Sequence, residues 1–120
     1  MSRVEERRKY PRLDCGFSIH CREHDRPALN DVSQVKNISL GGAYFTTSRP
    51  FEAGREVALR INLPPTRNLI LPLARVIESS EYAKGHAYDT RVEFSHIEDS
   101  DRLALSSVLN DYFEAQGKYK

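Results

Sequence analysis

Apolar and polar residues alternate along several short segments of this chain, which is the period of a β-strand with one buried face. The pattern is clearest over residues 57–63, where every second residue is valine, leucine or isoleucine. Similar alternation, or a run of strand-forming residues, occurs five more times. Strands are therefore predicted over six segments: 17–22, 32–38, 43–47, 57–63, 69–77 and 88–94.

Polar stretches with proline or glycine separate these segments and predict the connections between them. Residues 23–30 and 79–86 are interpreted as hairpin loops, and residues 48–54 as a turn. Gly41-Gly42 interrupts the extended pattern and predicts a tight connection or bulge before the next strand.

The segment 69–77 is apolar enough for a buried strand, but its parity is mixed. Leu69, Leu71 and Leu73 fall on one face, whereas Val76 falls on the other. Pro72 cannot donate to a strand ladder. A bulge or an edge position is predicted here to reconcile these features.

The apolar period changes to that of a helix from Asp99 onward. Leucine, valine and aromatic residues recur at helical spacing, Asp99 or Ser100 can cap the start, and Gly117 lies near the expected end. Six short strands followed by one amphipathic helix predict a mostly β fold. The expected architecture is a small six-stranded antiparallel β-barrel with a C-terminal α-helix packed against it.

A length of 120 residues fits one domain, and 18 basic against 17 acidic residues give a net charge near +1. This balance gives no global reason to expect a DNA or membrane partner. The positive charge is instead local, because residues 3–12 hold five basic side chains and two acidic ones. Residues 1–13 are predicted to form a flexible basic arm, and residues 14–117 the barrel with its helix.

No apolar segment approaches the roughly 18 to 20 residues that span a membrane, and the first residues do not resemble a signal peptide. A cytoplasmic location without membrane insertion is expected, with Cys15 and Cys21 as reduced thiols. A zinc site is disfavoured because the strand period places Cys21 on the apolar face and both His20 and His24 on the other. No metal site and no catalytic constellation are predicted, so we do not expect an enzyme.

Two short motifs carry the chemistry that the sequence suggests. Residues 7–12, Arg-Arg-Lys-Tyr-Pro-Arg, hold four cations in six positions, and Pro11 opposes a helix through them. Residues 37–42, Asn-Ile-Ser-Leu-Gly-Gly, combine an amide, a hydroxyl and two glycines that permit close approach. The first motif supplies positive charge, and the second supplies neutral hydrogen-bonding groups.

Together the motifs have the forms Arg-x-x-x-Arg, through Arg8 and Arg12, and (Asp/Asn)-x-Ser-x-x-Gly, through Asn37, Ser39 and Gly42. This pair, in this order, resembles the PilZ domain, a bacterial module that binds the second messenger cyclic di-GMP. The resemblance extends from about Glu6 to the final helix. It implies the same barrel and a single-domain receptor and adaptor that signals to an unidentified protein partner.

The resemblance also implies roles for particular residues. Cyclic di-GMP carries two phosphates and two guanines, and arginine can pair with both phosphate oxygens and guanine edges. Arg8 and Arg12 match the family pair, and Arg7 is an additional guanidinium that could contact a second ligand molecule.

The second motif would supply the other contacts to the ligand. Asn37 and Ser39 can bond the bases or phosphates, and Gly41 with Gly42 allows the backbone to approach the ligand. These residues complete the predicted site.

One position departs from the family pattern. Many PilZ sequences carry glycine two residues before the position of Glu93, in a Gly-hydrophobic-x-Phe run, whereas this chain has Arg91-Val92-Glu93-Phe94. Both ligand motifs are intact, but the surface beside this strand is expected to differ.

Two other functions are compatible with a small barrel. The first is a ligand-independent interaction module, against which the intact motifs count. The second is a nucleic-acid binder that would stack bases on Tyr44 and Phe45, although the near-neutral net charge does not favour it.

Overall fold

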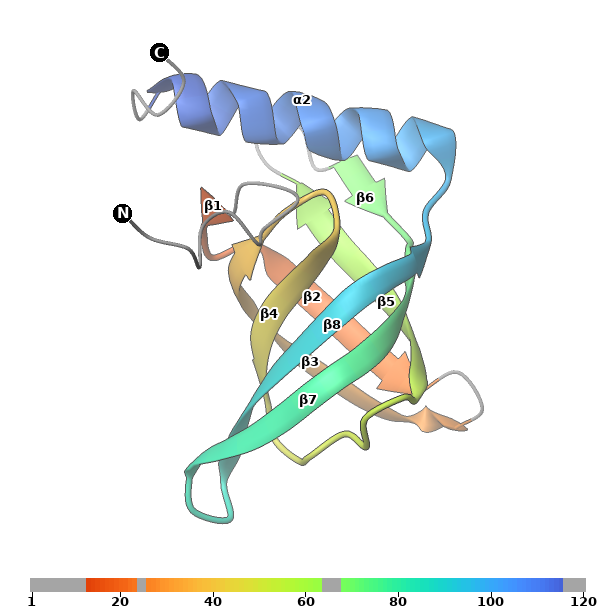
Figure 1. Cartoon of the computed structure of the whole chain (residues 1–120), viewed down its shortest axis with the longest axis vertical. Coiled ribbons are helices and arrows are strands. Elements are labelled where there is room, and N and C mark those ends of the chain that lie inside the picture. The colour runs from red at the N-terminus through yellow and green to blue at the C-terminus, as the bar shows by residue number, and fades with distance from the viewer. Residues whose placement is uncertain (1–12, 24–25, 64–67, 116–120) are drawn as a thin grey trace, which may run out of the picture.

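The structure is a computed structural model that describes residues 13–23, 26–63 and 68–115. The predicted arm motif, including Arg7, Arg8 and Arg12, and the residues His24 and Gly117 lie outside the described residues. Eight strands and one helix occur in the described part of the chain (Figure 1): β1 Leu13–Asp14, β2 Ser18–Glu23, β3 Arg26–Ile38, β4 Gly42–Thr47, β5 Glu56–Leu63, β6 Asn68–Ile70, β7 Leu73–Ala83, β8 Ala87–His96 and α2 Asp99–Ala115.

Six of the strands close into a barrel. Their order around it is β3-β2-β5-β7-β8-β4, and β4 returns to pair with β3. Every pairing is antiparallel. The two short strands are additions, because β1 pairs only with β3 and β6 only with β5. The predicted six-stranded antiparallel barrel is confirmed.

Alternate residues of the strands fill the barrel, as the period of two requires. In β5, for example, Val57, Leu59, Ile61 and Leu63 are all buried. Helix α2 lies across one end of the barrel (Figure 1) and buries its apolar face there, through Leu105, Val108, Leu109 and Phe113. The predicted C-terminal helix is therefore confirmed.

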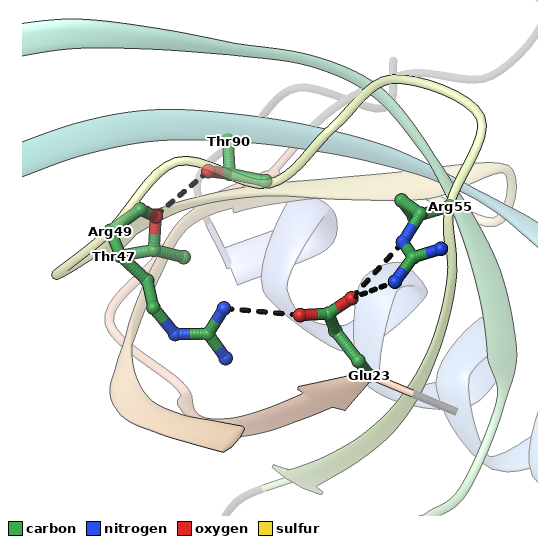
Figure 2. A network of polar contacts seen from close by, with 5 residues as sticks. All are labelled: Glu23, Thr47, Arg49, Arg55 and Thr90. Atoms are coloured by element: carbon green, nitrogen blue, oxygen red, sulfur yellow. Dashed lines mark hydrogen bonds and ion pairs between the residues drawn. The ribbon is translucent and has the colours of Figure 1, made fainter. Parts of the chain in front are cut away.

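A buried ion cluster lies at the other end of the barrel, where β2 ends and the β4–β5 connection passes. Glu23 accepts hydrogen bonds from Arg55 at 2.9 and 3.1 Å and from Arg49 at 3.2 Å (Figure 2). Beside it the hydroxyls of Thr47 and Thr90 are 2.9 Å apart. Burial opposes ionisation of Glu23, but the bonds from both arginines outweigh it and hold the pKa of this carboxyl below its usual range.

Two predicted loops are wrong in extent. Residues 26–30 belong to β3, where Asn30 pairs with Arg22, and residues 79–83 belong to β7, where Ser79 pairs with Thr90. After Val76, β7 has no buried residue. Its outer part pairs with β8 as a ribbon beyond the core (Figure 1), so backbone hydrogen bonds form the strand without an apolar face.

The mixed parity of segment 69–77 agrees with the predicted bulge or edge position, because β6 pairs only with β5 and the register shifts between Leu73 and Ala74. Ile70, Pro72, Ala74 and Val76 face inward, while Leu69 and Leu71 are exposed. Pro72 lies between β6 and β7, where its carbonyl accepts a hydrogen bond from the Leu59 N–H at 3.0 Å and no N–H is required of it. The segment therefore contains two strands instead of one.

Candidate functional site

The second motif forms the tight turn between β3 and β4. The Ser39 N–H donates to the Gly42 carbonyl at 2.9 Å, and the Gly41 N–H donates to the Ser39 hydroxyl at 3.1 Å. The Phe94 N–H of β8 donates to the Gly41 carbonyl at 2.9 Å, which ties the turn to the barrel wall. These bonds use the acceptor side of the Ser39 hydroxyl and leave its O–H able to donate to a ligand.

Gly42 is required by the packing of two backbones. A Cβ at this position would meet the Val92 carbonyl oxygen of β8 at 2.2 Å. Gly42 pairs with Glu93, so the β4 backbone lies against β8 here with no room for a side chain. The close approach that the sequence predicted at this glycine therefore occurs between the backbones of β4 and β8.

Strand β1 brings the end of the arm to this turn. Leu13 pairs with Ile38, Asp14 pairs with Asn37, and the Cys15 N–H donates to the Lys36 carbonyl at 3.0 Å. Arg12 is bonded directly to Leu13 in the chain. Leu13, the residue that follows the first motif, thus lies beside Ile38 of the second motif, where β1 runs alongside β3 (Figure 1).

The structure brings Asn37, Ser39, Gly41 and Gly42 together in one turn. The Asn37 side chain is half-buried and has no hydrogen-bond partner among the described residues, so its amide is available to a ligand. Beside the turn lies a hollow of about 390 Å³ between β8 and α2. Its lining includes Leu40, Gly41, Phe94, His96 and Arg102.

A group of polar and aromatic side chains, the outer-face cluster, extends from Asn37 across the outside of the barrel. It comprises Lys36, Tyr44, Tyr82, Asp89 and Arg91. The Lys36 ammonium is 2.7 Å from Asp89 and lies 5.7 and 4.7 Å from the centroids of Tyr44 and Tyr82. The Arg91 guanidinium is 5.4 Å from the Tyr44 ring, within cation–π range.

Sequence reasoning did not identify this cluster as a unit. A register shift between Val35 and Asn37 leaves both Lys36 and Asn37 outside the core, between the buried residues Val35 and Ile38. Tyr44 then pairs with Arg91 across β4 and β8. The signals in the sequence are the departure from the PilZ pattern at Arg91 and the aromatic residue Tyr44.

Neighbouring groups in the outer-face cluster set the protonation states of Lys36 and Tyr44. The hydrogen bond to Asp89 raises the pKa of Lys36 although burial lowers it, so the ammonium stays charged. Burial, and then Asp89, raise the pKa of Tyr44 and keep the phenol neutral. Arg91 lies 3.6 Å from Glu78, and its buried Nε has no hydrogen-bond partner among the described residues. The cluster thus presents cations and an aromatic face beside Asn37.

The expected positions of the cysteine and histidine side chains can be checked in part. Cys21 is buried in the barrel and His20 lies on the outer face, as the strand period predicts. Over the described ranges, no group of three histidine, cysteine or acidic side chains could hold a metal ion. Helix α2, the one helix within those ranges, does not combine the length and the apolar character needed to cross a membrane.

Comparisons with known proteins agree with the fold. The inhibitor of motility of Bacillus subtilis (MotI/DgrA) is 24% identical with a TM-score of 0.72, over 95% of this chain and 53% of that protein. The PilZ domain of YcgR from Escherichia coli, solved with c-di-GMP, is 17% identical with a TM-score of 0.67, over 93% of this chain and 98% of that domain. MrkH of K. pneumonia, solved as a complex with c-di-GMP, is 18% identical with a TM-score of 0.70, over 95% of this chain and 56% of that protein.

This chain therefore spans about half the length of MotI and of MrkH. Comparison with curated proteins gives no match. The family model of the PilZ domain matches residues 6–111, which is most of the sequence. The chain belongs to the PilZ domain family.

Proposed function

We propose that this protein is a receptor for cyclic di-GMP that acts by binding, without catalysis. The observation that carries the proposal is the pairing of Asp14 with Asn37. This pairing holds the two residues that follow Arg12 beside the second motif. Two PilZ proteins of the same fold, YcgR and MrkH, were solved with this nucleotide. Membership of the family makes the same ligand the first candidate here.

In the proposed site, the first motif would supply charged contacts to the ligand and the second motif would supply neutral hydrogen bonds. Arg8 and Arg12 would pair with the phosphates or the guanine edges, with Arg7 beside them. Asn37 offers an amide without a partner among the described residues, and Ser39 offers its O–H. Tyr44 and Arg91 border this surface and could stack on an exposed base.

Calorimetric titration tests the proposal directly. We expect cyclic di-GMP to bind with an affinity on the order of micromolar, or about −8 kcal/mol. Replacing Arg8 or Arg12 by alanine should weaken binding by about 1.5–3 kcal/mol, the scale of a charge-assisted hydrogen bond, which is about 10- to 150-fold. The fold should be unaffected.

Arg3→Ala is the matched control, because it removes a basic residue that precedes both motifs. It should bind like the unmodified protein. GMP and a short single-stranded oligonucleotide should give little heat. A stronger response to the oligonucleotide would favour the nucleic-acid alternative, although Phe45 is buried in the barrel and cannot stack on a base. No response to any ligand would favour a ligand-independent module.

We further propose that residues 1–12 close over the Asn37–Gly42 turn when the ligand binds. The arm has few apolar residues to offset an ordering cost of roughly 1–2 kcal/mol per residue, and its adjacent cations repel one another. Two ligand phosphates supply the missing negative charge. Closure would create a composite surface of protein and nucleotide that a partner protein could recognise, so that binding shifts a population between two states.

Hydrogen exchange tests this closure. Amides of residues 5–13 should gain protection when cyclic di-GMP is added, whereas those of residues 57–63, in the middle of the barrel, should change little. Equal protection of the arm with and without the ligand would mean that the receptor is preformed. The switching account would then be abandoned even if binding is real.

A further inference from the structure

A groove of about 370 Å³ lies on the outer wall of the barrel, over β2, β5 and the end of β6. His20 pairs with Arg60, and Arg22 pairs with Ala58, so these four side chains form adjacent rows on the outer face. Leu69 and Leu71 line the other side of the groove. In the order of strands around the barrel, β2 and β5 lie opposite β4 and β8. The groove is thus remote from the outer-face cluster and can be occupied independently.

The apolar side of the groove is exposed in a well-fixed segment. Leu71 is 54% exposed and Leu69 is 39% exposed. The Leu71 N–H donates to the Asp101 carboxylate of α2 at 2.9 Å, and the preceding and following residues, Ile70 and Pro72, are buried. Val32, which pairs with His20 on the neighbouring strand, is 68% exposed. Leu69 and Leu71 line one groove, and exposed apolar side chains grouped in this way are typical of an interaction site.

The two arginines of the groove differ from other arginines on the surface. Arg75 pairs with Glu93, and Arg91 pairs with Glu78. Arg22 and Arg60 have no carboxylate partner within the part of the chain that the structure describes. They occupy diagonal positions across β2 and β5, so their Cα atoms are separated by roughly 7–8 Å. The groove thus combines two unpaired cations with an apolar wall.

His20 adds a polar group to the lining of the groove. It lies opposite Arg60 and two residues before Arg22, and its Nε2 is buried with no hydrogen-bond partner among the described residues. A buried nitrogen of this kind is normally paired. An apolar group entering the groove would contact Leu69 and Leu71.

We infer that this groove binds an acidic segment of a partner protein, with two carboxylates on Arg22 and Arg60 and an aliphatic or aromatic side chain against Leu69 and Leu71. Charge complementarity selects this occupant, because carboxylates pair well with guanidinium groups and the rim offers two of them. Two acids separated by one residue in an extended segment, or by one helical turn, match the spacing of the arginines. Strand addition is not the mode, because both neighbours of β2 and of β5 in the barrel are occupied.

Selection from a random peptide display library on the full chain, with Arg22→Glu/Arg60→Glu as counter-selection, tests the inference. Enriched peptides should contain at least two acids and one large apolar residue. A synthetic enriched peptide should bind at least 10-fold more weakly to Arg60→Ala and to Leu71→Ser. It should bind normally to Lys84→Ala, which removes an exposed cation in the β7–β8 turn. Circular dichroism of each variant separates lost binding from lost folding.

Charge exchange gives a second readout. A peptide with lysines in place of its acids should bind the doubly reversed variant better than it binds the unmodified protein. Enrichment of uncharged or basic peptides, or equal binding by the groove variants, would overturn the inference. So would binding of citrate in the groove with no peptide selected, which would indicate a small anion site. Self-association that Leu71→Ser abolishes would instead assign the groove to a second copy of this chain.

Discussion

Replacing Gly42 by alanine is expected to lower the free energy of unfolding by about 3 kcal/mol or more, the scale of severe overpacking. The added Cβ would lie 2.2 Å from the Val92 carbonyl oxygen and 3.1 Å from the Glu93 Cα. Both contacts are with backbone atoms, which cannot rotate away as a side chain can. Strands β4 and β8 would have to separate, with loss of ladder hydrogen bonds at the closure of the barrel. Urea unfolding of both proteins measures the change.

Gly16→Ala is the matched control. The nearest atoms to a Cβ at Gly16 belong to the Gln34 side chain, at 3.9 and 4.0 Å, so this alanine should change stability by less than about 1 kcal/mol. Comparable losses in the two variants would show that the lack of space at Gly42 is not the cause. Calorimetry on Gly42→Ala would then be informative only at temperatures where the variant remains folded.

This distinction affects how the second motif is interpreted. A glycine in a ligand motif is easily assigned to ligand approach, yet the close contact at Gly42 lies between β4 and β8. Ser39 likewise holds the turn through its bond from the Gly41 N–H. If a variant of Gly42 or Ser39 loses nucleotide binding, the loss would therefore reflect both a disturbed fold and a lost contact with the ligand. Asn37, with no partner among the described residues, is the cleaner probe of contact.

Alternation of apolar residues predicted the barrel wherever a strand has one face in the core. The pattern at residues 57–63 and at Phe17, Ile19 and Cys21 corresponds directly to buried positions. It failed for residues 79–83, because both faces of the β7–β8 ribbon are polar or only partly buried there. Such a strand depends on its partner's backbone, and pairing between distant segments leaves no periodic signal in either one.

The candidate site also has one part that could be predicted from the sequence and one part that could not. Its turn could be predicted because the residues 37–42 are contiguous and match a family motif. The outer-face cluster could not, because it depends on the register that pairs Tyr44 with Arg91 and on the irregularity that exposes Lys36. Similarly, the mixed parity of segment 69–77 does not indicate which face is buried, and in the structure Ile70 and Pro72 face inward while Leu69 and Leu71 are exposed.

Glu23→Gln is expected to lower the free energy of unfolding by about 3 kcal/mol, because it removes the negative charge that Glu23 places beside Arg49 and Arg55 near the barrel end. Glu23 is only 7% exposed, and it is the acceptor for both Arg49 and Arg55 (Figure 2). The arginine side chains are 29% and 33% exposed, so water can hydrate them partly in the variant. This access places the expected loss at the lower end of the range for a broken buried ion pair.

Acid provides an independent test of the same cluster. The pKa of Glu23 is lower in the folded protein than the ordinary value of 4.5, so its contribution to stability is complete above that value and is lost as the pH falls through the folded pKa. The difference in stability between the unmodified protein and Glu23→Gln should therefore be largest near neutral pH and shrink in acid. Glu93→Gln is the control: its bond to Arg75 is also 2.9 Å, but both side chains are about half exposed, and the loss should stay below about 1 kcal/mol. If the two variants lose equal stability at neutral pH, burial is not what makes the Glu23 cluster strong.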